Sequence, residues 1–445
     1  MAVIGIELVD AAVVAVRDGV RLAASPGIAL LETSGVVVGD AAAVQARLKP
    51  VLATDRFWSD LSAESLAQGD AASVSHAELA HAHLASIWRA VSQPGDSAVF
   101  ALPGAMRLHQ VGLLLGIARR AGIPVAGTVD AAVAACAGFA ARGTILHLDV
   151  QLHQAVLTEL TGAAVLRRRR VDVAPRAGLK AMLSAWAQLV AEAMVRRTRF
   201  DPLHQAATEQ QLHERLPGWL TALARAESVD ASIETAAGTF SATLRREQFT
   251  LAAEAWYAQL AELVHGGHRA DEQATLALSA RAGLLPALGE RLASLPGLEP
   301  APLPLDAAAA AAAARADEIG PAEPPALVTA LARSIPAASG VRRNAAGARP
   351  THVIQDGRAH PIGAQPLVVG AGAGPGRRLE LGAGAGISRK HCALLAQGGE
   401  VLVRDTSRYG TWVNGERVEG EAVLAAGDRL RVGTPGVVLE LVAVG

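Results

Sequence analysis

A stretch rich in proline and glycine, residues 319–349, divides this chain of 445 residues into two parts of different character. Proline and glycine at this density interrupt both helices and strands, so we interpret the stretch as a linker. One short helix is expected inside it, near residues 327–333. The sequence therefore predicts a body of residues 1–318 and a tail of residues 350–445, and the tail has the usual size of one small domain.

The overall composition excludes several classes of protein. A chain with 51% hydrophobic residues can bury a large core, whereas 41 basic against 42 acidic side chains argue against a nucleic-acid partner. The sequence contains no uninterrupted apolar run of ~18 residues, so no membrane span is predicted. No basic segment precedes the apolar stretch at the N-terminus, so no signal peptide is predicted. The two cysteines, Cys136 and Cys392, have neither disulfide nor metal-site spacing, so we expect a reducing, cytoplasmic location. The oligomeric state stays open.

The body alternates strand and helix patterns, which predicts an α/β fold with layered sheets. Strands are expected at 2–8, 12–16, 36–39, 97–102, 123–125, 144–150, 154–160, 164–171 and 232–244. Helices are expected at 77–91, 109–121, 130–141, 179–223 and 246–264.

This order of elements resembles the superfamily of actin, sugar kinases and DnaK-type chaperones. The segment Val99-Phe100-Ala101-Leu102-Pro103 is similar to the chaperone branch's strand that ends in Val-Pro, and Val38-Gly39-Asp40-Ala41-Ala42 to its Val-Gly-x-Ala-Ala segment. The resemblance implies a two-lobed fold over residues 1–318 that, in its active members, binds ATP and Mg²⁺.

The residues that such a fold needs for nucleotide binding are degraded. The resemblance implies two glycine-rich hairpin turns that hold phosphates, each with an aspartate for Mg²⁺, because backbone N–H groups must approach phosphate closely. Glu7 stands where the first aspartate is expected, and Asp149 keeps the second, but Gln151-Leu152-His153 replaces the glycines. Arg281 lies where a Gly-Gly pair is expected to meet the purine. We interpret the body as a pseudo-ATPase with no cofactor and no catalytic residues; an ATPase that still binds Mg-ATP is the alternative.

Two other polar features of the body have structural explanations. The four consecutive arginines at 167–170 alternate along a predicted strand, so we expect a solvated sheet edge, with a partner-binding edge as the alternative. The histidines His76, His81 and His83 lack the spacing that brings neighbours together on a helix, so no metal site is predicted.

The tail contains short β-branched runs separated by glycine-rich turns, which predicts a small β-sandwich. Three of its segments, Ile387-Ser388-Arg389-Lys390-His391, the run from Asp405 to Gly415, and Ala426 to Gly433, resemble the signatures of a forkhead-associated (FHA) domain in order and spacing. This resemblance implies recognition of a phosphothreonine-containing partner, which fits the need for cations and hydroxyls on loops of a rigid sandwich.

The resemblance also assigns roles to residues. Ser388 and Arg389 are expected at the phosphate, and Ser407, Arg408, Tyr409 and Asn414 on or beside the second binding loop. Structural roles are expected for Gly370, His391, Gly410 and Thr411.

Two positions depart from the family's pattern. Ala371 follows Gly370 where an arginine that grips the phosphate is expected, and the nearest cations are Arg377 and Arg378. Tyr409 replaces the asparagine that holds the peptide backbone. The domain is therefore either a phosphopeptide reader or a scaffold module with phosphate-independent contacts.

Together these features favour a non-catalytic adaptor in a phosphorylation-linked signalling assembly, with a pseudo-ATPase body and an FHA module. The first alternative is an active DnaK-like ATPase or chaperone that its FHA domain regulates. An actin-like assembly protein is a further alternative.

Overall fold

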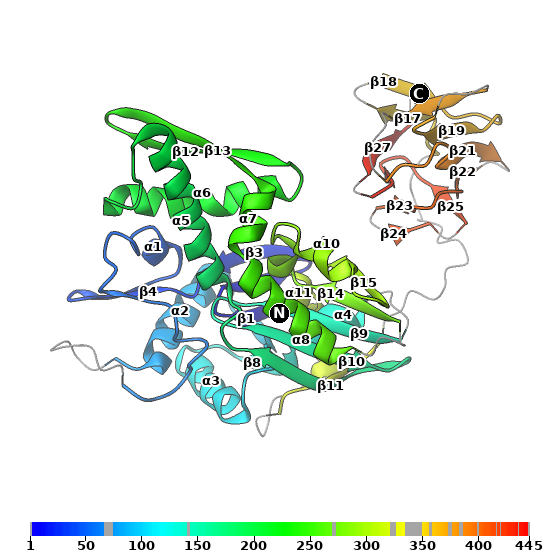
Figure 1. The fold of residues 1–445 in the computed structure, drawn as a ribbon. Helices are drawn as coiled ribbons and strands as arrows, with labels where there is room; N and C mark the ends of the chain where they lie inside the picture. The colour runs from blue at the N-terminus through cyan, green and yellow to red at the C-terminus, as the bar shows by residue number, and fades with distance from the viewer. Residues whose placement is uncertain are drawn as a thin grey trace. The chain divides into compact units, whose positions relative to one another are not determined.

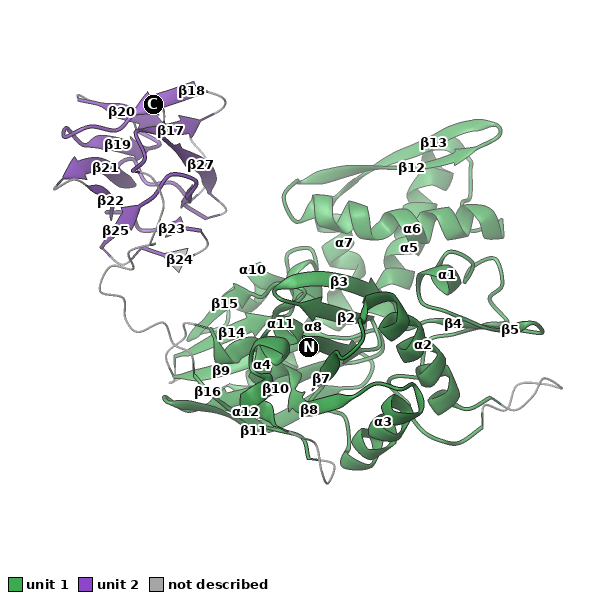
Figure 2. Cartoon of the chain, turned by 180° about the vertical axis from the view of Figure 1, so that it is seen from behind, with its two compact units in different colours: residues 1–335 green, residues 336–445 purple. Residues whose placement is uncertain are grey.

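The chain forms two compact units, residues 1–335 and 336–445, in a computed structural model (Figure 2). Each unit has its own hydrophobic core. The residues that the structure describes are 2–65, 74–139, 143–268, 273–320, 326–333, 349–355, 358–372, 376–381, 386–397, 400–414, 416–418, 420–434 and 436–443. Most of the predicted linker, and Gly415, lie outside these residues.

The first sheet of unit 1 has the strand order β3-β2-β1-β7-β8 (Figure 1). Its strands are β1 (Val3–Val9), β2 (Ala12–Arg17), β3 (Val20–Ser25), β7 (Ser97–Leu102) and β8 (Val125–Asp130). The first three pair antiparallel, and β7 and β8 continue the sheet parallel to β1. β1 and β7 are almost wholly buried, which explains why their sequences are nearly continuous apolar runs.

The second sheet repeats this topology. Its order is β15-β14-β9-β10-β11-β16, and β9, β10 and β11 pair antiparallel while β14 and β15 run parallel to β9. The strands are β9 (Thr144–Val150), β10 (Ala155–Thr161), β11 (Val165–Ala174), β14 (Ala274–Leu278), β15 (Leu298–Pro302) and β16 (Ala330–Ala332). In both sheets the first strand has two successive antiparallel strands on one side, extended by β16 in the second sheet, and two parallel strands on the other.

Two helices of small residues pack between these sheets, α4 (Ala131–Ala137) and α11 (Ala307–Ala314). A side chain at Gly5 of β1 would place its Cβ 1.8 Å from the carbonyl oxygen of Ala309, so the backbone of α11 rests directly on β1. The alanine tract is thus a helix that can approach a sheet closely because its side chains are short.

Larger helices cover the outer faces. α2 (His76–Val91) and α3 (Leu108–Arg120) share a core with the first sheet. α5 (Leu179–Thr198), α6 (Ala206–Leu223), α7 (Arg246–Ala252) and α8 (Glu254–Gly267) share one with the second. The hairpin of β12 (Ser228–Thr235) and β13 (Gly238–Arg245) packs on α5 and α6 (Figure 1).

The remaining elements of unit 1 are short. A small sheet has the order β5-β4-β6. The elements are β4 (Ala29–Glu32), β5 (Gly35–Val38), β6 (Ala53–Thr54), α1 (Asp40–Ala43), α9 (Ala280–Gly283), α10 (Leu288–Ala293) and α12 (Ala316–Ile319).

The helix predicted near residues 327–333 is wrong. This segment instead contains β16, which pairs antiparallel with β11, and Val328 forms a bridge to Val129 of β8. A segment this short gains little from a single helical turn, whereas strand pairing gives its backbone groups partners at once. The strand expected at 123–125 also lies further along, as β8.

The solvated edge predicted for the arginines at 167–170 is only partly found: Arg167, Arg169 and Arg170 are exposed, but β16 pairs with β11 from Val165 to Arg167. The arginines are also engaged in ion pairs. Arg168 lies 2.8 Å from the buried carboxylate of Asp130, and Arg170 lies 2.8 Å from Asp172. The run therefore serves pairing within unit 1.

Unit 2 is all-β, as predicted for the tail. One sheet has the order β18-β17-β27-β26-β23-β24 and the other β20-β19-β21-β22-β25, around one core. The strands are β17 (His352–Gln355), β18 (Arg358–Pro361), β19 (Leu367–Gly370), β20 (Arg378–Glu380), β21 (Cys392–Gln397), β22 (Glu400–Asp405), β23 (Thr411–Val413), β24 (Glu416–Arg417), β25 (Glu421–Leu424), β26 (Arg429–Val432) and β27 (Val437–Val442).

Within the described residues, none of the helices has both the length and the apolar character of a bilayer span. The same residues contain no cluster of three or more metal-binding side chains.

His83 on α2 is held neutral inside unit 1. Its Nδ1 accepts the indole N–H of Trp58 at 3.0 Å, which leaves the proton on Nε2 to donate to Ser25 Oγ at 2.8 Å. Burial lowers the pKa of His83 to about 4.

This burial predicts a pH-dependent stability of unit 1. The unfolded chain binds a proton at His83 near pH 6.5, but the folded chain binds it only near pH 4. The free energy of unfolding should therefore fall as the pH is lowered from about 6.5 to about 4, by on the order of 3 kcal/mol from this residue, and level off below. Urea titrations followed by tryptophan fluorescence measure it. His83→Gln, which cannot take up the proton, should flatten the slope, and an unchanged slope would contradict the assignment.

Candidate functional site

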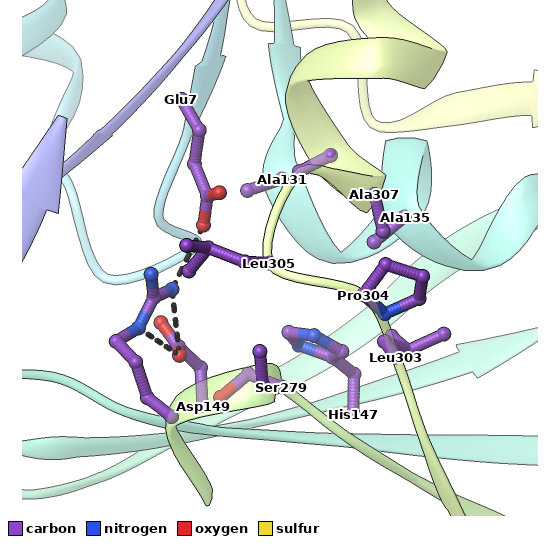
Figure 3. A pocket seen from close by; sticks show the side chains of 13 residues that line it. Glu7, Ala131, Ala135, His147, Asp149, Ser279, Leu303, Pro304, Leu305 and Ala307 are labelled. Atoms are coloured by element: carbon purple, nitrogen blue, oxygen red, sulfur yellow. Dashed lines mark hydrogen bonds and ion pairs between the residues drawn. The ribbon is translucent and has the colours of Figure 1, made fainter. Parts of the chain in front are cut away.

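A buried cluster of three charges joins the two sheets of unit 1 (Figure 3). Glu7 comes from β1 and Asp149 from β9, the central strands of the two sheets, and Arg281 comes from α9 directly after β14. The Nη2 of Arg281 lies 2.8 Å from Glu7 Oε1 and 2.9 Å from Asp149 Oδ1, and its Nε lies 3.1 Å from the same Asp149 oxygen. The three side chains are only 7–9% exposed.

The charges of the cluster depend on one another. Burial opposes ionisation of Asp149, but the neighbouring Arg281 and His147 outweigh it and hold the pKa of Asp149 below its usual value. At Glu7 burial dominates and raises the pKa in spite of Arg281. The two carboxylates overcome the burial of Arg281 and raise its pKa further, so its guanidinium stays charged.

Little space remains around this cluster. The cavity beside it has a volume of ≈ 20 Å³, and its lining includes His147, Ser279 and Ala308. Sites for ligands of drug size measure about 300–1,000 Å³. The sequence placed Arg281 at the adenosine position of a nucleotide site; in the structure its guanidinium instead reaches both carboxylates that the resemblance assigns to Mg²⁺.

A second bridge between the sheets is made by Asp10, a residue that sequence reasoning missed. Asp10 lies in the turn between β1 and β2, and its carboxylate accepts the backbone N–H of Leu152 at 2.8 Å and that of His153 at 3.3 Å. Burial raises the pKa of Asp10, although these hydrogen bonds oppose the shift. The amides of the second hairpin turn are therefore bound by an anion of the chain itself.

A further ion pair involves Asp55, which follows β6 of the small sheet. It lies 2.6 Å from Lys180 Nζ at the start of α5 and 3.1 Å from His153 Nε2. Burial opposes its ionisation, yet the hydrogen bonds from His153 and Lys180 lower the pKa of Asp55 to about 2. Neither Asp10 nor Asp55 belongs to a sequence motif, because their partners lie far away along the chain.

In unit 2, His391 fixes two loops to each other. Its Nδ1 accepts the backbone N–H of Ser388 at 3.0 Å, so the ring proton lies on Nε2, which donates to the carbonyl oxygen of Gly410 at 2.6 Å. The ring is fully buried. These two hydrogen bonds agree with the structural role expected for His391, because they hold the loop before β21 against the loop before β23.

The second loop is also fixed internally. Asp405 accepts the backbone N–H of Ser407 at 3.0 Å and the hydroxyl of Thr411 at 2.9 Å, and Ser407 Oγ accepts the N–H of Gly410 at 2.7 Å. Gly410 has a φ of +83°, and a Cβ there would lie 2.8 Å from the ring of Trp412. Glycine is required at this position for both reasons.

Ser388 of the first loop is hydrogen-bonded to Arg408 of the second loop. Its Oγ accepts the backbone N–H of Arg408 at 3.3 Å, which leaves its own proton free to donate. The side chains of Arg389, Lys390 and Arg408 are exposed, and the structure gives them no ion-pair partner among the described residues. Tyr409 beside them is 50% exposed. This pair of loops therefore places exposed cations beside a hydroxyl.

Gly370 at the end of β19 packs against the first of these loops. A Cβ at Gly370 would lie 2.5 Å from the carbonyl oxygen of Arg389 and 2.7 Å from that of Ser388. The next residue, Ala371, donates its N–H to the carbonyl oxygen of Ser388 at 3.1 Å. A side chain at residue 370 would push the loop away from the strand.

The two arginines that follow lie differently. Arg377 donates to the carbonyl oxygens of Gln365 and Pro361. Arg378 donates to the carbonyl oxygen of Gly372, a residue whose Cα faces the side-chain stem of Arg389. Of the two cations near Ala371, Arg378 is therefore the one held beside the loops.

Asn414 lies in the turn between β23 and β24, with a φ of +53°. Its amide donates to Asp428 at 2.7 Å, and its Oδ1 accepts the N–H of Arg429 at 2.8 Å. These contacts stabilise the sandwich, and a role of Asn414 in peptide binding stays a prediction.

The FHA domain family matches residues 368–433, which lie inside unit 2 and include both loops. Unit 2 therefore contains an FHA domain, a class of module that recognises phosphothreonine-containing partners. No curated protein matches the chain.

Removal of Arg281 tests whether the cluster in unit 1 holds the sheets together. Arg281→Ala leaves two buried carboxylates without a counter-ion and should lower the free energy of unfolding by about 3–5 kcal/mol, as measured by urea titration. The matched control is Arg291→Ala, because Arg291 pairs with Glu254 at 2.6 Å but is 34% exposed. It should cost less than about 1 kcal/mol. Equal effects of the two substitutions would contradict a special role for the buried cluster.

Proposed function

We propose that the protein is a non-catalytic adaptor whose FHA domain binds threonine-phosphorylated partners in a cytoplasmic signalling assembly. The observation that carries this proposal is the loop pair fixed by His391, which presents the Ser388 hydroxyl beside Arg389 and Arg408. Phosphate is recognised best by charge-assisted donors that need no rearrangement on binding. The near-neutral net charge of -1 supports a local anion site rather than a nucleic-acid partner.

For unit 1 we propose the two-lobed fold of actin-like ATPases, with the DnaK-type chaperones as the related branch. The support is the repeated topology, in which the first strand of each sheet has successive antiparallel strands on one side and two parallel strands on the other. Glu7 and Asp149 come from corresponding places, near the hairpin ends of β1 and β9. A two-lobed fold with one hairpin turn of this kind in each lobe fits what the resemblance implies.

We further propose that this unit is a pseudo-ATPase. Arg281 supplies a positive charge to the two carboxylates, and Asp10 supplies a negative charge to the amides of the second turn. The groups that would bind Mg²⁺ and phosphate are thus already bound to charges of the chain. An internal guanidinium at bonding distance also competes with any metal ion without a loss of translational freedom.

Phosphopeptide binding is tested by calorimetry of the full chain with threonine-phosphorylated peptides and their unphosphorylated counterparts. We expect binding of phosphorylated peptides only, with a loss of about 10-fold or more in Ser388→Ala and Arg389→Ala, since each removes a hydrogen-bond donor to a charged group. Arg404→Ala is the matched control, because Arg404 is exposed but pairs with Glu421 at 2.5 Å. Equal binding of unphosphorylated peptides would favour phosphate-independent contacts instead.

The pseudo-ATPase proposal predicts that millimolar Mg-ATP neither shifts the unfolding temperature of unit 1 nor is hydrolysed. Differential scanning calorimetry and phosphate release measure the two effects. A shift that disappears in Asp149→Ala would overturn the proposal and favour an active ATPase or chaperone.

A further inference from the structure

We propose that the FHA domain selects phosphothreonine peptides that carry acidic side chains close to the phosphothreonine. This inference rests on the proposed phosphothreonine binding and adds a substrate class to it. It is carried by the number and position of unpaired cations around the two loops.

Three of these cations surround Ser388. Arg389 and Lys390 follow it directly, and the backbone of Arg408 is bound to its Oγ at 3.3 Å. All three side chains are exposed, and none has an ion-pair partner in the part of unit 2 that the structure describes. They alone exceed the charge of one phosphate group, about −1.5 to −2 at neutral pH.

A fourth cation, Arg417 of β24, lies beside the second loop. A Cβ placed at Gly410 would be 3.1 Å from Arg417 Nε, so this side chain runs next to the residue whose carbonyl His391 fixes. Arg417 pairs across the strands with Trp412, whose ring is stacked by Arg431 at 3.7 Å. Arg417 is exposed and has no ion-pair partner among the described residues.

Asp405, the acidic residue nearest to Arg408 in the sequence, forms no ion pair with the loop cations among the described residues. It uses Oδ1 for the N–H of Ser407 and the hydroxyl of Thr411. Elsewhere on the same sandwich, Arg404 and Arg429 do have acidic partners, Glu421 and Glu440. The excess of positive charge is therefore a property of the loops.

These charges set the preference of the site. One phosphate offsets about two of these positive charges, and the remaining cations repel one another until a ligand brings further negative charge. A glutamate or aspartate within a few residues of the phosphothreonine supplies it, whereas a lysine there adds repulsion. Since the cations are exposed, each acidic residue should strengthen binding by only about 2- to 5-fold, and salt should reduce the gain.

The test compares three phosphothreonine peptides that differ only in the flanking residues, which are glutamate, alanine or lysine. Affinities for the full chain are measured by calorimetry at low and high ionic strength. We expect the order glutamate, alanine, lysine, with differences that shrink at high salt. In Arg417→Ala the ratio between the glutamate and alanine peptides should fall toward one, whereas in the matched control Arg404→Ala it should stay as in the wild type.

The outcomes separate the two proposals. Equal affinities for the three peptides, or a preference for alanine flanks, would overturn the acidic selectivity and leave phosphothreonine recognition standing. Absence of binding to all phosphorylated peptides would overturn both. A glutamate preference that persists unchanged in Arg417→Ala would overturn the role of Arg417.

Discussion

The ion pairs of Arg281 decide how the two sheets of unit 1 can meet. Glu7 and Asp149 come from the central strands of different sheets, and both are nearly excluded from water. Two such carboxylates repel each other and lose their hydration unless a cation lies between them. In a metalloenzyme the cation is exchangeable, but here it is attached to α9 and belongs to the fold. The closed arrangement therefore needs no ligand, and Asp10 and Asp55 close the same gap with further charges of the chain.

Unit 2 uses arginine in the opposite way. Its loops are held by the ring of His391, the hydroxyl of Ser407 and the carboxylate of Asp405, and none of these contacts uses a loop arginine side chain. The charged ends of Arg389 and Arg408 are left exposed at the surface. Because the loops are fixed before a ligand arrives, ordering them costs little binding energy, and the cations can contribute to affinity directly.

Features that depend on residues close together along the chain could be predicted from the sequence. The α/β alternation of the body, the β-rich tail, and the FHA signatures around Ser388 and His391 are of this kind. The segment at 327–333 is predicted wrongly because a short apolar run has no period of its own, and its pairing with β11 is decided by the sheet.

The contacts of Arg281 and Asp10 could not be predicted from the sequence either, because their partners are distant along the chain. The degraded motif placed Arg281 near the nucleotide-site residues, but it did not predict the ion pair with Asp149. That pair depends on the fold, because Asp149 lies 132 residues away in the sequence. No sequence pattern indicated a role for Asp10, since its partners, the amides of Leu152 and His153, are backbone groups that every sequence has.

The distribution of unpaired charge differs between the two units. In unit 1 the charged groups at the meeting point of the sheets are paired with one another, so a charged ligand there would have to break ion pairs before it could bind. In unit 2 the cations on the loops have no such partners among the described residues, and an anion gains their attraction without that cost. The same residue type is thus paired inside unit 1 and left exposed on the loops of unit 2. The difference between them is whether the neighbouring strands supply a carboxylate within reach.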